Sequence, residues 1–456
     1  MANDIFNYLE DKIKENESAI FKEKKMEYNL DNIFKIVEQF IIDKKLICYG
    51  GTALNNILPK DTQFYNYDVS SPDYDFFSKD ALNDVKELAN IFKKKKYKQI
   101  QAKSAIHNGT YKLYVNYIPV ADITQMNETI FDKLSKDCII RDDIRYAPIH
   151  FLRMNLFLEL SRPRGDLSRW EKILKRLIIL NQAYPFTITD CIQKINYTSN
   201  NIKNESHFNI IKKILLEEDN NVFIGEFAIT KYSKHFPTTY KKVINTNKYP
   251  TFITINSDTT TYINKIKENK NITVKKVSNI DDVLPTFYKL FIDNIIYSIV
   301  IQTEGCQSYN EITVNKKQIK IGNLDTMLFY YFMFFYLDID SKNNDLLNNL
   351  YCYAYILFYL QENYKKTNNK LLQRFNISCI GYQTTFEDII DNKYKLYEKL
   401  RKKGDKKEIH KYFLKYTPRN TVKKKTKTKT KTKTKTKTKT KTKSKTKTKK
   451  LMDKFY

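Results

Sequence analysis

The sequence predicts an α/β (α+β) protein: a small mixed sheet with helices that carries the candidate site, a second degenerate copy of that unit, a helical end and a loose basic tail. Over residues 46–123, short apolar runs typical of buried strands alternate with stretches whose apolar residues recur at helical spacing. A shorter version of this pattern returns after residue 220. Because alternating strands and helices assemble into a sheet covered by helices, these observations favour the α/β class.

The elements of the first unit can be placed one by one from their apolar spacing. A helix is expected from residue 30, where apolar residues form one stripe, and the glycines that follow the first strand mark a helix start. A hairpin is expected around the turn 107–109. We expect strands at 46–49, 74–77, 97–103, 110–116 and 119–123, and further helices at 80–93, 149–160 and 168–183.

The chain divides by composition into four expected parts. Residues after 185 turn rich in asparagine and lysine, which places the main boundary there, and the C-terminus is a Lys-Thr repeat. The parts are an N-terminal helical segment, 1–29; a first α/β domain, 30–184; a second, degenerate domain, 185–420; and a disordered tail, 421–456.

Composition excludes several classes of protein. Hydrophobic residues make up 41% of the 456, so the chain can bury a large core and is not wholly disordered. Glycine, with 9 residues, and proline, with 10, are too rare for a collagen-like chain. Two apolar runs, 327–337 and 350–360, are too short to span a bilayer and predict buried helices. No signal peptide is expected at the N-terminus.

Positive charge is concentrated in the tail. The chain has 80 Lys and Arg against 51 Asp and Glu, a net charge of +29. Residues 423–450 hold 16 lysines and no acid, so 80 − 16 = 64 basic residues remain against 51 acids, and the rest is still +13. A surplus of this size favours a polyanionic partner. The tail either holds phosphate backbones non-specifically or is a solvated segment without a site, and the sequence leaves both open.

The six cysteines are scattered and form no C-x-x-C pair. Their spacing therefore indicates neither a zinc module nor a disulfide framework. We expect reduced thiols and a reducing compartment.

A strand that ends in two glycines is the first candidate binding element. The apolar run 46–49 leads into Gly50 and Gly51, and a helix follows. Glycines let a ligand approach the backbone, and the N–H groups at a helix start attract phosphate. Thr52 adds a hydroxyl, and Asn55, one turn later, is a weaker candidate. We expect this turn to hold a triphosphate.

Three carboxylates form the second candidate element. Asp73 and Asp75 flank Tyr74, so on a strand they project from one face, where like charges repel unless a cation neutralises them. Asp122 lies in the apolar strand 119–123. A D-x-D alone is usually a solvated loop, but the order of glycines, paired acids and third acid favours a site. Three such carboxylates suit two Mg²⁺ or Mn²⁺ ions.

These motifs resemble those of a known superfamily. Gly50-Gly51-Thr52, Asp73-Tyr74-Asp75-Phe76 and Val120-Ala121-Asp122-Ile123 resemble the polymerase-β-type nucleotidyltransferases. The narrower resemblance, from about residue 40 to 420, is to the poly(A) polymerase catalytic subunit of large DNA viruses, the poxvirus and giant-virus group. Four further stretches support it: 159–172, 223–228, 305–310 and 413–419.

The resemblance implies template-independent addition of AMP from ATP to an RNA 3′ end, with 30–184 as the catalytic domain. It implies that Asp73 and Asp75 are the first two metal carboxylates and Asp122 the third, on the side of the RNA 3′-hydroxyl. It implies ATP and the RNA 3′ end as partners, and no association with a membrane. The implied location is the host cytoplasm or the virion. A smaller processivity subunit or self-association stays open.

Other functions are compatible with the same acids. CCA addition, oligoadenylate synthesis and transfer of AMP to a protein use the same chemistry. A non-catalytic RNA-binding scaffold is the alternative outside enzymes, although retention of all three acids argues against it.

Basic residues after the third acid are further candidates. We expect Arg162 and Arg164 to meet the triphosphate or the RNA backbone. The alternative is a solvated basic face paired with nearby acids. The helix that follows carries three more on one face: Arg169, Lys172 and Arg176.

A faint repeat suggests that the first unit is duplicated. Residues 223–229 line up with 48–54, and 252–256 take the place of 73–77 without the acids. The repeat predicts a second, chemically silent copy, and chance similarity is the alternative.

Overall fold

The structure is a computed structural model that describes residues 2–187, 195, 203–244, 247–278, 285–336, 344–363 and 369–419. The chain up to Pro418 forms one compact unit, and a second begins at Arg419. The tail expected at 421–456 lies outside the described residues, as does Cys191. The domain boundary at 184/185 stays a prediction.

The N-terminus consists of two helices. Helix α1 (Ala2–Tyr28) is largely exposed, and Asn29, with a φ of 51°, separates it from α2 (Leu30–Lys44). The expected stripe makes α2 a helix that packs into the core. It buries Leu30, Ile33, Phe34, Ile36, Val37, Phe40 and Ile41.

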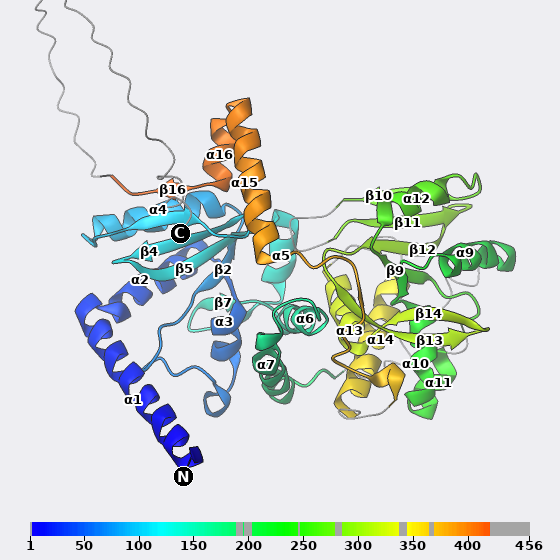
Figure 1. Ribbon diagram of the computed structural model, residues 1–456, viewed down its shortest axis with the longest axis horizontal. Coiled ribbons are helices and arrows are strands. Elements are labelled where there is room, and N and C mark those ends of the chain that lie inside the picture. Colours follow the sequence, from blue (N-terminus) through cyan, green and yellow to red (C-terminus); the bar gives the residue numbers. More distant parts are fainter. Residues whose placement is uncertain are drawn as a thin grey trace, which may run out of the picture. The chain divides into compact units, whose positions relative to one another are not determined.

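The first sheet is mixed and contains every strand expected from residues 46–123 (Figure 1). Its strands run in the order β16-β3-β4-β5-β2-β1-β7-β6, with β2/β5 and β1/β7 parallel and the other neighbours antiparallel. The strands are β1 (Ile47–Tyr49), β2 (Asp75–Ser78), β3 (Gln101–Ser104), β4 (Thr110–Val115), β5 (Ile118–Gln125), β6 (Ile139–Arg141), β7 (Ile144–Tyr146) and β16 (Lys415–Tyr416). The last three were not expected from the sequence.

Between residues 50 and 183, five helices accompany the strands of the first sheet, and four of them were expected. Helix α5 was missed because its apolar stripe is short. The helices are α3 (Gly50–Ile57), α4 (Ala81–Lys94), α5 (Glu128–Lys136), α6 (Ile149–Leu160) and α7 (Trp170–Ala183).

One face of the sheet is packed and the other is accessible. On β4, Tyr111, Leu113 and Val115 are buried and contact the α4 side, while Lys112 and Tyr114 point the other way and stay partly exposed. This alternation is the period of two that a strand imposes. The accessible face is where the candidate acids lie.

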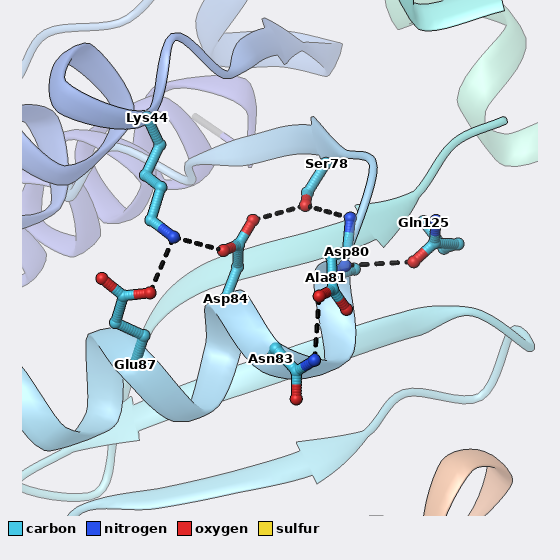
Figure 2. Close-up of polar contacts among 8 residues, drawn as sticks. All are labelled: Lys44, Ser78, Asp80, Ala81, Asn83, Asp84, Glu87 and Gln125. Carbon is cyan, nitrogen blue, oxygen red and sulfur yellow. Dashed lines mark hydrogen bonds and ion pairs between the residues drawn. The ribbon is translucent and has the colours of Figure 1, made fainter. Parts of the chain in front are cut away.

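A polar network fixes the register of the two acid-bearing strands (Figure 2). The Ser78 hydroxyl donates to Asp84 at 2.5 Å, and Asp84 accepts from Lys44 at 3.0 Å. Gln125, the β5 partner of Ser78, accepts from the Ala81 backbone N–H at 3.0 Å. The end of β2 is thereby tied to α2, to the start of α4 and to β5.

The second sheet repeats the arrangement of the first. Its order is β10-β11-β12-β9-β8-β14-β13-β15, with β9/β12 and β8/β14 parallel, as β2/β5 and β1/β7 are in the first sheet. The predicted second copy is therefore present: the order from β10 to β13 repeats the order from β3 to β6, while β15 and β16 are added at opposite edges. Its strands are β8 (Asn221–Phe223), β9 (Phe252–Asn256), β10 (Thr273–Val277), β11 (Phe287–Ile292), β12 (Ile295–Gln302), β13 (Gln307–Val314), β14 (Lys317–Gly322) and β15 (Cys379–Ile380).

The register of the repeat corrects the sequence alignment by one residue. A Cβ on Gly225 would lie 2.7 Å from the Ile253 nitrogen, just as one on Gly50 would lie 2.5 Å from the Asp75 carboxylate. Ile253 therefore takes the place of Asp75, where the alignment had put Thr254. A slip of one residue exchanges the faces of a strand, so only the pairing reveals it.

Helices join the two halves of this unit. The two apolar runs form α13 (Leu324–Phe334) and α14 (Asn344–Asn363), as expected, and α13 packs against α6. The Ser161 hydroxyl donates to Gln307 at 2.9 Å. Further helices beside the second sheet are α9 (Glu205–Glu217), α10 (Glu226–Tyr232), α11 (Thr238–Ile244) and α12 (Thr259–Lys267). No helix of the described part is long and apolar enough to cross a membrane.

The C-terminal segment returns to the first sheet (Figure 1). Helices α15 (Phe386–Lys403) and α16 (Lys406–Tyr412) lead to β16, which pairs with β3. The Leu414 backbone N–H donates to the Ser104 hydroxyl at 2.6 Å. Lys415 is thus an edge residue of the sheet that carries the acids.

Two cysteines correct the expectation that the chain has no disulfide. Cys306 and Cys379 are bonded, with their Cα atoms 5.3 Å apart. They lie at neighbouring ends of β13 and β15, which pair antiparallel. Their separation of 73 residues along the chain explains why spacing gave no signal. Cys48 is a buried free thiol, in keeping with a packing role.

Candidate active site

The acids meet on the accessible face of the first sheet. Asp75 on β2 lies directly opposite Asp122 on the parallel strand β5, and the Asp122 backbone N–H donates to the Tyr74 carbonyl at 2.9 Å. Asp73, exposed just before β2, is close enough for its charge to act on Asp75. Residues paired across strands point to one face, so tertiary structure brings together acids that are far apart in the chain.

Negative charge is in excess here. Burial, and then the charges of Asp73 and Asp122, raise the pKa of Asp75 to about 8. Burial also raises the pKa of Asp122, while the Lys112 ammonium, 2.5 Å from its carboxylate, acts in the opposite direction. One lysine does not neutralise three carboxylates, so the site favours a proton or a further cation.

The donor set fits a divalent cation, but the ligands are not yet gathered around one. In the described part of the chain, no three His, Cys, Asp or Glu side chains are grouped closely enough to hold a metal ion as they stand. Asp122 contacts Lys112 instead. Carboxylate oxygens are the ligands that Mg²⁺ and Mn²⁺ prefer, and the raised pKa of Asp75 marks the place where a cation would replace a proton.

The two glycines place a helix start against the acids. Gly50 begins α3 with a φ of +75°, and a Cβ on it would lie 2.5 Å from Asp75 Oδ2. A Cβ on Gly51 would lie 2.5 Å from the Tyr65 hydroxyl and 3.2 Å from Arg176 Nη1. The turn therefore lies between the carboxylates on one side and a guanidinium on the other.

Arg176 is the basic residue that the structure brings to this turn. Its Nη2 donates to the Tyr65 hydroxyl at 2.7 Å, and its guanidinium lies 4.5 Å from the centre of the Phe64 ring. Stacking and hydrogen bonding hold the planar group in one orientation beside Gly51. A fixed guanidinium at the start of a helix is suited to a phosphate group.

Residues 35–166, which hold the acids and the turn, match the model of the poly(A) polymerase catalytic subunit family. The chain resembles viral poly(A) polymerase catalytic subunits. A relative so named from Acanthamoeba polyphaga mimivirus is 29% identical over 240 residues, which are 49% of this chain and 40% of the relative. One from African swine fever virus (isolate Tick/Malawi/Lil 20-1/1983) is 33% identical over 165 residues, 35% of this chain and 34% of the relative.

The chain thus spans less than half the length of these curated relatives. The fold has a solved counterpart in the crystal structure of the Megavirus polyadenylate synthase, with a TM-score of 0.71. The match covers 91% of this chain and 85% of the other at 20% identity. The expected α/β fold is therefore confirmed.

The Thr52 and Asn55 side chains hydrogen-bond the backbone that surrounds the candidate site. Thr52 is 1% exposed, and its hydroxyl donates to the Asp73 carbonyl at 2.7 Å and accepts from the Asp73 N–H at 3.2 Å. The fully buried Asn55 accepts from the backbone N–H groups of Phe64 and Tyr65 at 2.8 and 2.7 Å. Thr52 thus anchors the backbone of one acid, and Asn55 holds the loop that carries Tyr65, in place of the phosphate contacts we expected.

Arg162 and Arg164 are not brought to the turn. Burial lowers the pKa of Arg162, and a Cβ on Gly305 would lie 2.9 Å from its Nε, so it packs against the second half of the unit. Arg164 is exposed. Arg169 pairs with Glu159 at 3.1 Å, as in the alternative of a solvated basic face.

The structure thus brings Arg176 to the turn, and a role of Arg162 or Arg164 in binding stays a prediction. Helical spacing placed Arg176 on a face with Arg169 and Lys172. What singles it out is the loop of Phe64 and Tyr65, which tertiary structure brings to it. Two adjacent aromatics in a polar loop were the available signal.

Proposed function

We propose that this chain is the catalytic subunit of a template-independent poly(A) polymerase that adds AMP from ATP to the 3′ end of viral mRNA. The supporting observation is the pairing of Asp75 with Asp122 beside the Gly50 turn, in a chain that resembles viral poly(A) polymerase catalytic subunits. The fold likeness to a polyadenylate synthase agrees with it.

Each part of the site has a task in this reaction. The N–H groups at the start of α3 and the Arg176 guanidinium orient the triphosphate of ATP. Asp73, Asp75 and Asp122 would hold two Mg²⁺ or Mn²⁺ ions, which supply charge for the attacking 3′-hydroxyl and the leaving pyrophosphate. Lys112 neutralises Asp122 in the absence of a cation. No covalent enzyme intermediate is required.

Primer extension tests the proposal. The purified chain, a labelled single-stranded RNA, Mg²⁺ or Mn²⁺ and each of the four NTPs in turn should give extension with ATP, and only when RNA is present. The double variant Asp73→Ala and Asp75→Ala should lose extension and keep RNA binding. Products without RNA would indicate oligoadenylate synthesis, labelled protein would indicate AMP transfer, and RNA binding without extension would indicate a scaffold.

The partners follow from the relatives' names. They are called catalytic subunits, and we propose that this chain works with a second subunit or a second copy of itself, in the cytoplasm of the infected cell. Light scattering of the purified chain distinguishes a monomer that needs a partner from a homodimer.

A further inference from the structure

A row of charged side chains crosses the accessible face of the first sheet at one level. Asp75 pairs with Asp122 across β2 and β5, and Asp122 pairs with Lys112 across β5 and β4. Lys112 pairs with Lys103 across β4 and β3, and Lys103 pairs with Lys415 across β3 and β16. Directly opposed residues share a face, so three lysines lead from the acids to the sheet edge.

The two outer lysines are available to a ligand. Lys112 is paired with Asp122. Neither Lys103 nor Lys415 has an acidic partner within ion-pair distance among the residues that the structure describes. Strands lie about 4.8 Å apart, so Asp122 and Lys415, three strands away from each other, are separated by about 14 Å. A short stretch of single-stranded RNA covers that length.

Aromatic side chains border the outer part of the row. A hollow of about 370 Å³ is lined by Lys93, Tyr97, Lys103, Tyr114 and Tyr117, together with residues that follow β16. The Lys103 ammonium lies 5.2 Å from the centre of the Tyr114 ring. Tyr117 is 76% exposed in the β4–β5 turn. Exposed aromatics beside lysines stack on unpaired bases while the charges hold the phosphates.

We propose that Lys103 and Lys415, with Tyr114 and Tyr117, form the track that guides the single-stranded 3′ segment of the RNA to the acids. The inference rests on the proposed function and names the path of its substrate. The 3′ end lies at Asp122, and the strand leaves over β16.

The second sheet offers a matched control. There Ile253 pairs with Ile299, Ile299 with Lys289, and Lys289 with Lys275. The lysines recur at the same level, but isoleucines stand where the acids would be. Lys275 is exposed and is the counterpart of Lys103, so its replacement changes the net charge equally without touching the track.

Fluorescence anisotropy with a labelled single-stranded RNA, without ATP or metal, tests the track. Lys103→Glu and Lys415→Glu should each weaken RNA binding roughly tenfold, and each lost phosphate contact should reduce the slope of log K against log salt by about 0.7. Lys275→Glu should bind as the unchanged chain does. Thermal unfolding of each variant tests whether the fold is intact. Lys103→Ala, a milder replacement, repeats the test without adding a negative charge.

Two results would overturn the track: unchanged RNA affinity for both track variants, or an equal loss for Lys275→Glu. Extension assays separate this failure from failure of the proposed function. If Lys103→Glu weakens RNA binding while the unchanged chain never extends RNA, the result supports the track and contradicts the proposed polymerase function. If Lys103→Glu extends RNA with an unaltered KM for RNA, the result supports the proposed polymerase function and contradicts the track.

Discussion

Gly50 faces Asp75 so closely that a Cβ atom on the glycine would lie 2.5 Å from the carboxylate oxygen Oδ2. The carboxylate fills the space that a side chain would need, and the φ of +75° is one that residues with a Cβ rarely adopt. The Gly50 turn and the Asp75 carboxylate therefore pack against each other, and neither can change alone.

Gly50→Ala should remove RNA extension, because the new methyl group displaces Asp75, and it should lower the free energy of unfolding by about 1–3 kcal/mol. Extension assays and urea unfolding measure the two effects. Gly404→Ala is the control: Gly404 has a φ of +67° and no atom within 4 Å, so it should show backbone strain with full activity. Equal activity of the two variants would contradict the arrangement.

Asp75 makes the stability depend on pH and metal. Its pKa of about 8 lies above its ordinary value, so the folded state holds the proton to higher pH and its stability falls as the pH rises toward 8. In Asp75→Asn, the decrease of folding stability with rising pH should be smaller. Mg²⁺ or Mn²⁺ competes with the proton, so its effect on the melting temperature should be larger at pH 9 than at pH 6.

Melting curves at both pH values, with and without metal, measure these effects. Asp61→Asn, at an exposed acid, is the control and should behave as the unchanged chain does. A metal effect that is equal at pH 6 and pH 9 would rule out Asp75 as a ligand with a raised pKa.

Arg176→Ala should raise the KM for ATP by about ten- to a hundredfold, the loss expected for one charge-assisted contact, and leave RNA affinity unchanged. Arg176→Lys should restore little, because an ammonium neither stacks on Phe64 nor holds Tyr65 in the same geometry. Steady-state extension at varied ATP is the measurement. Arg169→Ala, which removes an ion pair with Glu159, should have no effect on the KM for ATP.

Deletion of residues 423–450 removes 16 lysines. Lysines that contact phosphates release counterions from the RNA, so without them RNA binding should be weaker and should depend less on salt. The rate at saturating RNA should stay the same, since the acids lie in the first sheet. Binding titrations at several salt concentrations, with single-turnover extension, test both statements. RNA affinity unchanged at low salt would show that the tail is a solvated segment only.

Local signals carried much of the prediction. The apolar stripe from Leu30, the strand that ends in Gly50 and the acid inside an apolar strand are each written in a few neighbouring residues. Strands of two or three residues, such as β6, β7 and β16, hold too few side chains to show a period, and their pairing partners stabilise them. The one-residue slip in the repeat has a different origin: all five residues of β9 are buried, so this strand shows no alternation that could fix its register.

By itself, the sequence determined which chemical groups are present and in what order: glycine turn, paired acids, third acid, basic helix and basic tail. Tertiary structure alone decided which of them meet. It opposed Asp75 to Asp122, chose Arg176 over Arg162 for the turn, and aligned Lys103 with Lys415 across a strand from the far end of the chain. The physical reason is that strand pairing and packing act between distant segments, whereas periodicity and turn chemistry act between neighbours.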